Sequence, residues 1–463
     1  PMRLALPARR RHNLPAELTT IIGRDPETIW IMEALRDPAA RLITVAGVGG
    51  TGKTRLALHV GRQLAADLAV DGEAPDADHP LADGVFLVDL AGLDGGAQSE
   101  EQIAAAIADA LQLKLDSVDP DAVAAALCDR RLLLILDNFE LLQGVGLYLT
   151  TLLERAPGLR LLVTSRVRLK LRGEKVLVLD GLPAPPEDET ALQRFPATAL
   201  FMRAAITAAA TSELRLDQAD AEAIAATCRL LHGLPLGIEL AAAWMPMLSP
   251  REILTEIRQG LDFLQSDMPD LPERHRSLRS VFERSWLQLS EGERAGLARL
   301  ALFRGGFSRH AAEEVANASL LILRQLHDKL LIRFADPEDE ASSQGGRYEI
   351  AEILRQYAAE RLDDPAVYRD TRTRHVRFFL DFLAERQPEL RSGDQPGALD
   401  AIGDEIDNIR FALVWLCESG GVSAEMPTQR FRQGAFALFD FLDTRGWYAE
   451  GAALLAQLAD AVE

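Results

Sequence analysis

The sequence predicts an α/β domain with a parallel sheet, followed by domains that are almost entirely helical. Its 463 residues are enough for two to four domains of ~100–200 residues each. Hydrophobic residues make up 48% and charged residues 26% of the chain, a balance that excludes a disordered or collagen-like protein. Strand-like and helix-like runs alternate only in the first part of the chain, which separates the two kinds of domain.

The alternating part of the chain ends near residue 179. Short runs rich in leucine and β-branched residues are separated by helical patterns near residues 53–68, 101–113 and 139–155. Strands that alternate with helices at this spacing favour a parallel sheet that is covered on both faces. The expected strands are Leu42–Ala46, Val85–Leu90, Leu132–Leu136, Arg160–Thr164 and Lys175–Leu179.

Proline and acidic residues between Gly181 and Thr190 mark a boundary, after which helical patterns dominate. Two of these helices begin with capping boxes, at Ser249 and Ser290. Two apolar runs, 330–334 and 348–350, flank a polar loop, which predicts a β-hairpin that closes a winged helix. Beyond about residue 366 the chain has the pattern of amphipathic helices, whose expected core or inter-helix contacts are Trp415, Phe436, Phe439 and Trp447.

Acidic residues outnumber basic ones: 70 Asp and Glu against 50 Lys and Arg give a net charge of −20. This balance argues against wrapping a nucleic acid, because such binding needs basic surface to displace phosphate counterions.

The cysteines Cys128, Cys228 and Cys417 lie too far apart in sequence for a disulfide framework, so we expect a reducing, cytoplasmic location. No apolar run reaches the ~18–20 residues of a membrane helix, so no membrane partner is expected.

The strongest motif is Gly47–Thr54, which matches G-x-x-x-x-G-K-[ST] between a strand pattern and a helix pattern. Its glycines let the backbone turn tightly and direct N–H groups at phosphate oxygens, at the positive end of a helix dipole. Lys53 is expected to bridge β- and γ-phosphates, and Thr54 to offer its hydroxyl to Mg²⁺. The alternative, a glycine-rich turn with an incidental Lys-Thr pair, is disfavoured by the flanking elements.

Two further strands end in polar residues at the same edge of the sheet, where ligands of open α/β sheets bind. Asp137 ends the third expected strand and is expected to act on Mg²⁺ indirectly, by contacting the groups that bind the metal. Glu140, three residues later, could orient or deprotonate an attacking water. Arg166 follows the fourth strand and could reach the γ-phosphate. Each residue also has a purely structural alternative. Asp137 could simply end its strand, Glu140 could be an acid that favours the first turn of a helix, and Arg166 could be a surface arginine.

Four motifs in chain order resemble those of the NB-ARC type of STAND NTPase, and most of all its bacterial regulators. They are the phosphate loop, Leu136–Glu140, Thr164–Arg166 and Gly233–Leu236. In the last of these, proline suits a first helical turn and can lay a flat apolar face on a nucleobase, although a Gly-x-Pro turn alone is common before a helix. Ile21–Asp25 resembles the motif that lines the adenine pocket in that family, and the similarity covers about residues 13–450.

The resemblance implies that ADP or ATP binds at this site together with Mg²⁺. The catalytic residues implied are Lys53, Asp137, Glu140 and Arg166, with Thr54 and Asp137 at the metal. The residues implied for nucleotide binding are Ile22, Gly23, Arg24, Gly47, Gly49, Gly50, Thr51, Gly52, Lys53, Thr54, Arg55, Pro235 and Leu236.

The resemblance also implies a domain order. The expected domains are a linker at 1–18, the P-loop nucleotide-binding domain at 19–182, a small helical domain at 183–268, a winged helix at 269–365 and a further helical domain at 366–463, where a tetratricopeptide-like sensor array could begin. Members of the family rest as closed ADP-bound monomers and open on nucleotide exchange, often into oligomers. An effector domain is therefore expected before this piece and a sensor domain after it, and direct nucleic-acid binding by this piece is not expected.

Two positions depart from the family pattern. Its Met-His-Asp motif aligns with Ile350-Ala351-Glu352, so the histidine that would hold the ADP β-phosphate is missing and a looser closed state is expected. Leu326-His327-Asp328 imitates that motif but lies earlier, in a leucine-rich helix. Asn138 stands where many relatives carry a second aspartate, so hydrolysis is expected to be slow.

The favoured function is a signalling switch, and a slow regulated ATPase, whose nucleotide gates assembly in transcriptional control or in defence against phage. A constitutive mechanical ATPase is the alternative, and it predicts rapid turnover without a trigger. A helical scaffold with a vestigial nucleotide site is the third hypothesis. The intact Lys53, Thr54 and Asp137 disfavour it.

Overall fold

The structure is a computed structural model that divides into two compact units, Pro1–Ser285 and Trp286–Glu463. The residues that it describes are 11–17, 19–68, 79–91, 93, 99–139, 146–187, 189, 192, 194–210, 214–265, 276–335, 346–392, 394–418 and 428–448. Within these ranges, every helix is too short or too polar to cross a lipid bilayer.

The first unit contains one five-stranded sheet whose strands are all parallel. Its strands are β1 (Leu42–Ala46), β2 (Gly84–Asp89), β3 (Leu132–Asp137), β4 (Leu159–Ser165) and β5 (Glu174–Val178). They lie in the order β2-β3-β4-β1-β5, so the strand that leads into the phosphate loop is next to β4 rather than β3. The predicted parallel sheet and all five predicted strands are confirmed, each within one residue at either end.

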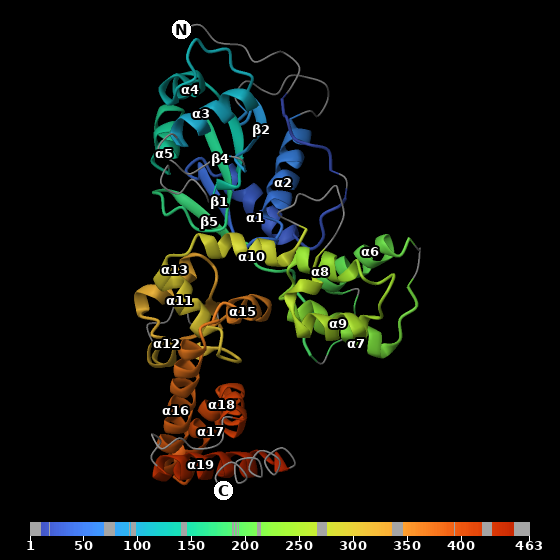
Figure 1. The fold of residues 1–463 in the computed structure, drawn as a ribbon. Helices are drawn as coiled ribbons and strands as arrows, with labels where there is room; N and C mark the ends of the chain where they lie inside the picture. The colour runs from blue at the N-terminus through green and yellow to red at the C-terminus, as the bar shows by residue number, and fades with distance from the viewer. Residues whose placement is uncertain are drawn as a thin grey trace. The chain divides into compact units, whose positions relative to one another are not determined.

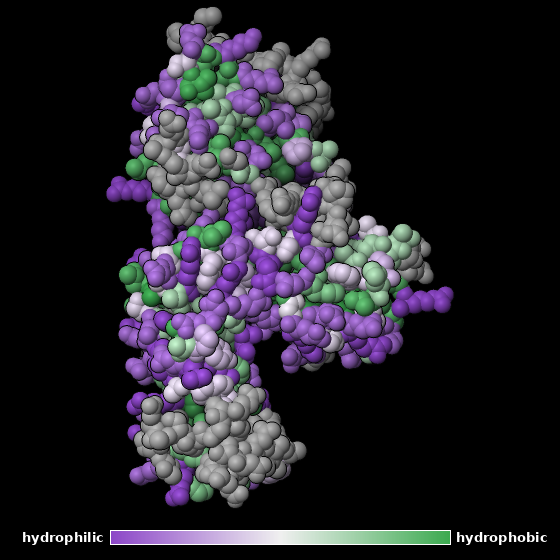
Figure 2. Space-filling view, viewed as in Figure 1, coloured by the Kyte–Doolittle hydropathy of each residue, from purple (hydrophilic) through white to green (hydrophobic). Residues whose placement is uncertain are grey.

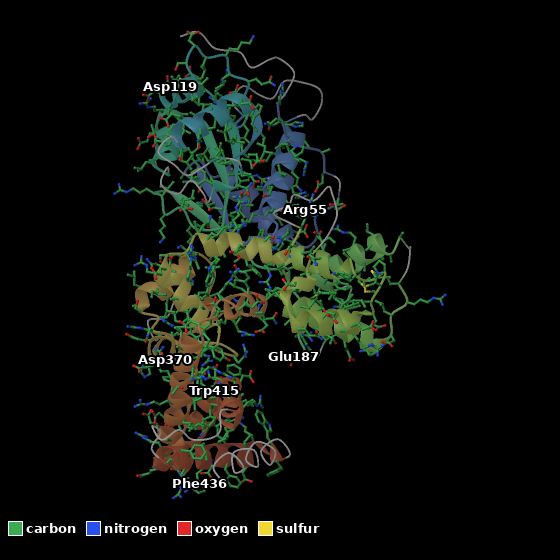
Figure 3. The ribbon with its side chains drawn as sticks, viewed as in Figure 1. Arg55, Asp119, Glu187, Asp370, Trp415 and Phe436 are labelled. Carbon is green, nitrogen blue, oxygen red and sulfur yellow. The ribbon has the colours of Figure 1, made fainter. Side chains whose placement is uncertain are left out.

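Helices cover both faces of this sheet, as predicted. Helices α1 (Asp25–Arg36) and α2 (Lys53–Asp67) lie on one face, and α3 (Ser99–Ala110), α4 (Pro120–Leu127) and α5 (Gly146–Arg155) lie on the other (Figure 1). Helices α1 and α4 are absent from the sequence-based prediction. The start of α4 has a sequence signal, because Asp119, labelled in Figure 3, is followed by proline at the first helical position. Asp119 caps the helix by accepting a hydrogen bond from the Ala122 N–H at 2.8 Å.

The leucine-rich strand β3 shows why the sequence predicts two covered faces. Leu132, Leu134 and Leu136 pack into the core with α3, α4 and α5. Leu133 and Ile135 alternate with them and pack into the core with α1 and α2. A strand that is buried on both sides reads as a continuous apolar run rather than an alternating one.

The first unit continues with a helical part. Its helices are α6 (Pro196–Ala208), α7 (Gln218–Leu230), α8 (Pro235–Ala242), α9 (Pro250–Gln259), the 3₁₀ turn η3 (Leu261–Phe263) and α10 (Leu278–Leu287). Helix α6 packs on α8, and α7 packs on α9. The capping box at Ser249 is confirmed. The visible surface over α7 and α9 is largely hydrophilic, as expected for helices that bury a single face (Figure 2).

In the second unit, a group of helices packs with a small sheet. The helices are α11 (Glu291–Leu300), α12 (Arg309–Ala316), α13 (Leu320–Asp328) and, after the sheet, α15 (Glu352–Ala359). Strands β7 (Arg333–Phe334) and β8 (Arg347–Glu349) pair antiparallel, which confirms the predicted hairpin pairing. Strand β6 (Phe307–Ser308) adds a third strand beside β8 that the sequence reading lacks. As expected, His327 lies in helix α13.

The last helices are α16 (Pro365–Leu390), α17 (Gln395–Asp404), α18 (Ile406–Glu418) and α19 (Thr428–Arg445), with α17, α18 and α19 packed against α16. Of the expected core or inter-helix contacts, a place in the core is wrong for Phe436 and Phe439, which are 56% and 50% exposed. Figure 3 shows Phe436 on α19. Leu438, Phe441 and Leu442 form the buried stripe of α19 instead. Their spacing of three and four residues puts them on one helical face and turns the two phenylalanines away from it.

Candidate functional site

The phosphate loop connects β1 to α2 at the carboxyl edge of the sheet. Gly52 occupies the N-cap position of α2 with φ of +91°, a left-handed conformation that favours glycine. A Cβ atom added at Gly52 would meet nothing within 4 Å, so the loop opens onto free space in front of the helix. Backbone amides and the helix dipole favour an anion at that place.

Lys53 and Thr54 are the first residues of α2. The Lys53 ammonium donates hydrogen bonds to the carbonyl oxygens of Gly47 at 2.7 Å and Val48 at 2.9 Å, which places it inside the curve of the loop. The Thr54 hydroxyl donates to a carboxylate oxygen of Asp137 at 2.7 Å. The structure therefore brings together the three residues that the sequence predicts for phosphate and Mg²⁺.

Asp137 ends β3 and is almost completely buried, at 4% exposure. Besides Thr54, it accepts hydrogen bonds from the Thr164 hydroxyl and, at 2.8 Å, from the Asn138 amide. Thr54 lines the cavity described below and Asp137 lies behind it. This arrangement is expected when a hydroxyl binds the metal directly and a carboxylate behind the hydroxyl fixes its orientation.

A second carboxylate lies at the same edge of the sheet. Asp89 ends β2 directly opposite Asp137 in the strand register, and its carboxylate accepts a hydrogen bond from the Asn138 amide at 3.3 Å. Asn138 thus bridges two carboxylates, with φ of +64°, a conformation that asparagine tolerates better than most residues. The sequence reading missed Asp89, although a strand that ends in an acid was the same signal that identified Asp137. Glu140 lies outside the described residues.

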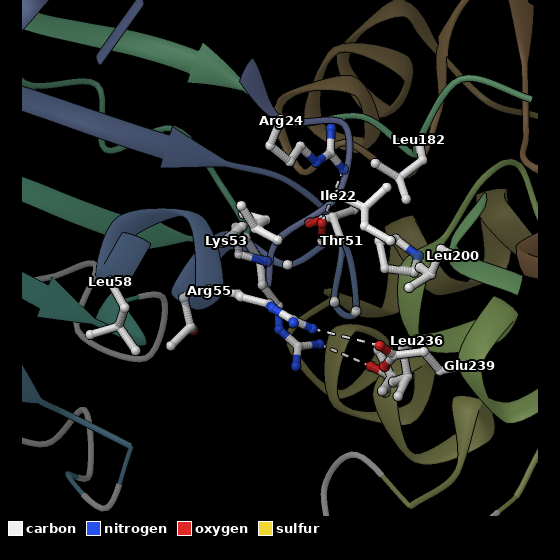
Figure 4. Close-up of a pocket in the computed structure, with 18 of the residues that line it drawn as sticks. Ile22, Arg24, Thr51, Lys53, Arg55, Leu58, Leu182, Leu200, Leu236 and Glu239 are labelled. Carbon is white, nitrogen blue, oxygen red and sulfur yellow. Dashed lines mark hydrogen bonds and ion pairs between the residues drawn. The ribbon is translucent and has the colours of Figure 1, made fainter. Parts of the chain in front are cut away.

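A cavity of about 350 Å³ opens at the phosphate loop, within the ~300–1,000 Å³ usual for small-molecule sites (Figure 4). The loop end of the cavity is lined by Gly49, Gly50, Thr51, Gly52, Lys53, Thr54, Asn138, Arg166 and Val281. The remaining wall is formed by Ile21, Ile22, Arg24, Arg55, Leu58, Leu182, Leu200, Arg203, Pro235, Leu236 and Glu239. The cavity therefore has one end rich in backbone amides and another rich in apolar side chains.

Most of the predicted nucleotide-binding residues line this cavity, and two do not. Gly47 lies at the end of β1 and Gly23 lies before α1, where an added Cβ would come within 2.2 Å of Pro196. Gly23 thus allows close packing against α6 rather than contact with a ligand. Leu58, Leu200, Arg203, Glu239 and Val281 line the cavity but were missed, because they come from helices whose packing the motifs do not reveal.

The run Gly233–Leu236 docks the helical part directly on the phosphate loop. The Leu236 N–H donates to the Gly50 carbonyl oxygen at 3.2 Å. Pro235 occupies the first helical position of α8, as predicted. Gly233 has φ of +65°, and a Cβ there would lie 1.9 Å from the Leu182 carbonyl oxygen, so only glycine fits this turn.

Arg166 follows β4 at the predicted edge and lines the cavity. Its guanidinium donates to the Val281 carbonyl oxygen at 2.9 Å and to the Ser285 hydroxyl at 2.7 Å, both on helix α10. The same guanidinium lies beside the phosphate loop, 3.4 Å from the position of a Cβ added at Gly49. Arg166 therefore joins α10 to the wall of the cavity.

Arg24 lines the cavity but its guanidinium also braces the loop. It is 4% exposed and donates to the carbonyl oxygens of Thr51 at 3.1 Å and Asp180 at 2.7 Å. It also pairs with Glu27 at 2.7 Å. Through these hydrogen bonds, Arg24 ties the phosphate loop to the segment that follows β5.

Replacing Arg24 by alanine is expected to lower the free energy of unfolding by about 2–4 kcal/mol, because the buried carbonyl oxygen of Thr51 and the partly buried one of Asp180 lose their donor. Urea denaturation followed by circular dichroism measures this change. Arg36→Ala, on the exposed face of the same helix, is the matched control and should change stability by less than about 0.5 kcal/mol. Equal stability of the two variants would show that Arg24 is no brace.

Comparisons with known proteins give relatives but no family model that matches the chain. The uncharacterized protein Rv0894 of Mycobacterium tuberculosis is 30% identical over 362 residues, covering 76% of this chain and 84% of that protein. Rv0890c of the same organism, provisionally named an HTH-type transcriptional regulator, is 30% identical over 394 residues and 83% of this chain. Regulatory protein AfsR of Streptomyces griseus is 29% identical over 405 residues, covering 83% of this chain and 37% of that protein.

Among solved structures, a STAND protein with a tetratricopeptide repeat sensor, PH0952 from Pyrococcus horikoshii, covers 98% of this chain and 65% of that chain. It is 16% identical to this chain, with a TM-score of 0.31. The chain spans 40% of the length of Rv0890c.

The parallel sheet, the phosphate loop that leads into α2 and the carboxylate at the end of β3 define the class: a P-loop NTPase fold with helical extensions. Within that class the chain belongs to the same family as the uncharacterized protein Rv0894 of Mycobacterium tuberculosis.

Proposed function

We propose that this chain is the nucleotide-controlled switch of a larger regulatory protein. The observation that carries the proposal is the cavity, because its wall combines the phosphate loop with residues of α8 and α10. A ligand that fills it contacts the α/β part and the helical part at the same time. The regulatory names of the relatives Rv0890c and AfsR support this class of function.

The described residues fit an adenine nucleotide with Mg²⁺. The amides of the phosphate loop and Lys53 would hold the phosphates, and Thr54, oriented by Asp137, would hold Mg²⁺. Mg²⁺ is usually held by a few protein groups together with substrate phosphates, and when bound it neutralises phosphate charge. The apolar end would hold the base between Ile22 and Pro235. Adenine, rather than another base, is proposed from the family resemblance alone.

Arg166 is the proposed link between nucleotide state and conformation. Shifting a population from 1:99 to 99:1 needs a differential of ~5.5 kcal/mol, and one hydrogen bond to a charged group contributes ~1.5–3 kcal/mol. Arg166 could exchange its contacts to Val281 and Ser285 for contacts to a γ-phosphate. Two or three contacts that change together would supply the free energy that this shift needs. No rearrangement of the sheet is required.

The whole-protein features are also proposals. We infer a closed ADP-bound monomer that opens and oligomerises with ATP, slow hydrolysis, a cytoplasmic location, and the domain bounds 19–182, 183–268, 269–365 and 366–463, with effector and sensor domains outside this piece. Output in transcription is favoured over defence against phage by the names of the relatives. Direct nucleic-acid binding by this piece is not proposed, because its net charge is −20.

The nucleotide extracted from freshly purified protein tests the proposal, together with the mass in solution. The expected result is ADP in a monomer, with slow turnover of added ATP. Rapid turnover without a trigger would favour a mechanical ATPase instead. Material that is empty and takes up no labelled ADP or ATP would contradict a nucleotide switch of any kind.

A further inference from the structure

Three charged side chains meet at the wall of the cavity beyond the phosphate loop. Glu239 comes from α8, one helical turn after Pro235, while Arg55 comes from α2 and Arg203 from α6. A guanidinium nitrogen of Arg55 lies 3.6 Å from a carboxylate oxygen of Glu239, and the two side chains point toward each other (Figure 4). None of the sequence motifs accounts for this cluster.

Main-chain carbonyl groups of the segment before α1 hold both arginine side chains in place. Arg55 donates to the carbonyl oxygens of Thr19 at 2.9 Å and Thr20 at 3.1 Å. Arg203 donates to the same Thr20 carbonyl oxygen at 2.5 Å. Their positive charge is therefore held in place beside Glu239.

The Glu239 carboxylate is half-buried and faces the cavity. Burial raises the pKa of Glu239, and the positive charges of Arg55 and Arg203 oppose that rise. Its side chain is 42% exposed, and it lines the cavity. An ionised carboxylate can accept about four hydrogen bonds, so the ion pair with Arg55 leaves it with acceptor capacity toward a ligand.

The place of this cluster along the cavity determines which part of a nucleotide it meets. Arg55 follows Thr54 directly, so its pair with Glu239 lies next to the phosphate end. Apolar side chains on the far side of the pair from Leu58, those of Ile22 and Leu200, also line the cavity (Figure 4). In a nucleotide, the sugar is the group between the phosphates and the base.

We propose that Glu239 accepts hydrogen bonds from the ribose hydroxyl groups of the bound nucleotide and so selects ribonucleotides over deoxyribonucleotides. Two vicinal hydroxyls present two donors to the two carboxylate oxygens, and an acidic residue reads the ribose 2′-hydroxyl in the same way in dinucleotide-binding folds. The proposal rests on the proposed function of the cavity. It adds the part of the ligand that the carboxylate recognises.

A site built around a hydroxyl rejects an analogue without it, because the carboxylate then loses a partner inside the cavity. The parent protein is therefore expected to bind 2′-deoxy-ADP about 10- to 100-fold more weakly than ADP. Glu239→Ala should weaken ADP binding at least to the level that the parent shows for 2′-deoxy-ADP, because both hydroxyl contacts are lost, and should bring its dissociation constants for ADP and 2′-deoxy-ADP within about twofold. Glu239→Gln keeps the size and one acceptor oxygen, so it should give an intermediate ratio and serves if the alanine variant does not fold.

Isothermal titration of the full chain with ADP, 2′-deoxy-ADP and GDP measures these ratios. Glu222→Ala, on the exposed face of α7, is the matched control and should keep the parent ratio. Equal binding of ADP and 2′-deoxy-ADP by the parent, or an unchanged ratio in both Glu239 variants, would overturn the assignment while leaving the nucleotide site intact. A change only in the preference for ADP over GDP would assign Glu239 to the base instead. A parent protein that binds none of the three would remove the proposed function itself.

Discussion

Lys53→Ala is expected to weaken ADP and ATP binding by roughly 10- to 150-fold for each hydrogen bond that its ammonium makes to phosphate. The reason is local, because the ammonium lies inside the curve of the phosphate loop, held by the carbonyl oxygens of Gly47 and Val48. A phosphate that enters the loop meets this positive charge together with the amides at the start of α2. Alanine leaves the amides and removes the charge.

Isothermal titration with ADP in the presence of Mg²⁺ measures this loss, and circular dichroism checks that the variant is folded. Lys175→Ala is the matched control: Lys175 forms an exposed ion pair with Asp37 at 2.8 Å, away from the cavity, and its removal should leave binding unchanged. Parent-like affinity in folded Lys53→Ala would mean that the cavity does not bind phosphate.

Asp137→Asn is expected to lower the affinity for Mg²⁺ by roughly 10- to 100-fold, the usual cost of losing a group that orients a metal ligand. The carboxylate accepts hydrogen bonds from Thr54, Thr164 and Asn138 at once. An amide in its place has one acceptor oxygen, so its NH₂ group faces either the Asn138 donor or the hydroxyls of Thr54 and Thr164. In either orientation the set of contacts that holds Thr54 is disturbed, and a negative charge is lost behind the metal.

Titration of the ATP hydrolysis rate with Mg²⁺ shows this change as a higher half-saturating concentration. Binding of ADP without Mg²⁺ should stay close to that of the parent, which separates a metal defect from a damaged pocket. Asp121→Asn, an exposed partner of Arg155, is the control for the loss of one acidic group. If Asp137→Asn required no more Mg²⁺ than the parent, Asp137 would be a strand-ending aspartate and nothing more.

The features predicted best from the sequence are those that depend on residues adjacent in the chain. The five strands follow from apolar runs such as Leu132–Leu136, and the positions of Lys53, Thr54 and Asp137 follow from motifs whose local geometry is fixed by glycines and by strand ends. The phosphate loop therefore needed no knowledge of tertiary packing. Its helix α2 begins at Lys53, where the motif places it.

What the sequence did not reveal depends on how helices pack. Glu239 and Arg203 lie far from the phosphate loop in sequence, and only the packing of α6 on α8 brings them to one wall. Phe436 was expected to make a core or inter-helix contact, yet it is exposed, and the helical spacing of Leu438 and Leu442 decides which face of α19 is buried. Residue type was a poorer guide there than periodicity.

The junction between the phosphate loop and α8 joins two main-chain groups, the Leu236 N–H and the Gly50 carbonyl oxygen. Every residue type except proline carries that donor, and every residue type carries that acceptor. Sequence drift in the side chains around the junction therefore leaves the bond itself intact. Family members that share only 30% of their residues can therefore keep this attachment while the side chains around it change, apart from glycines such as Gly233 that the turn itself requires.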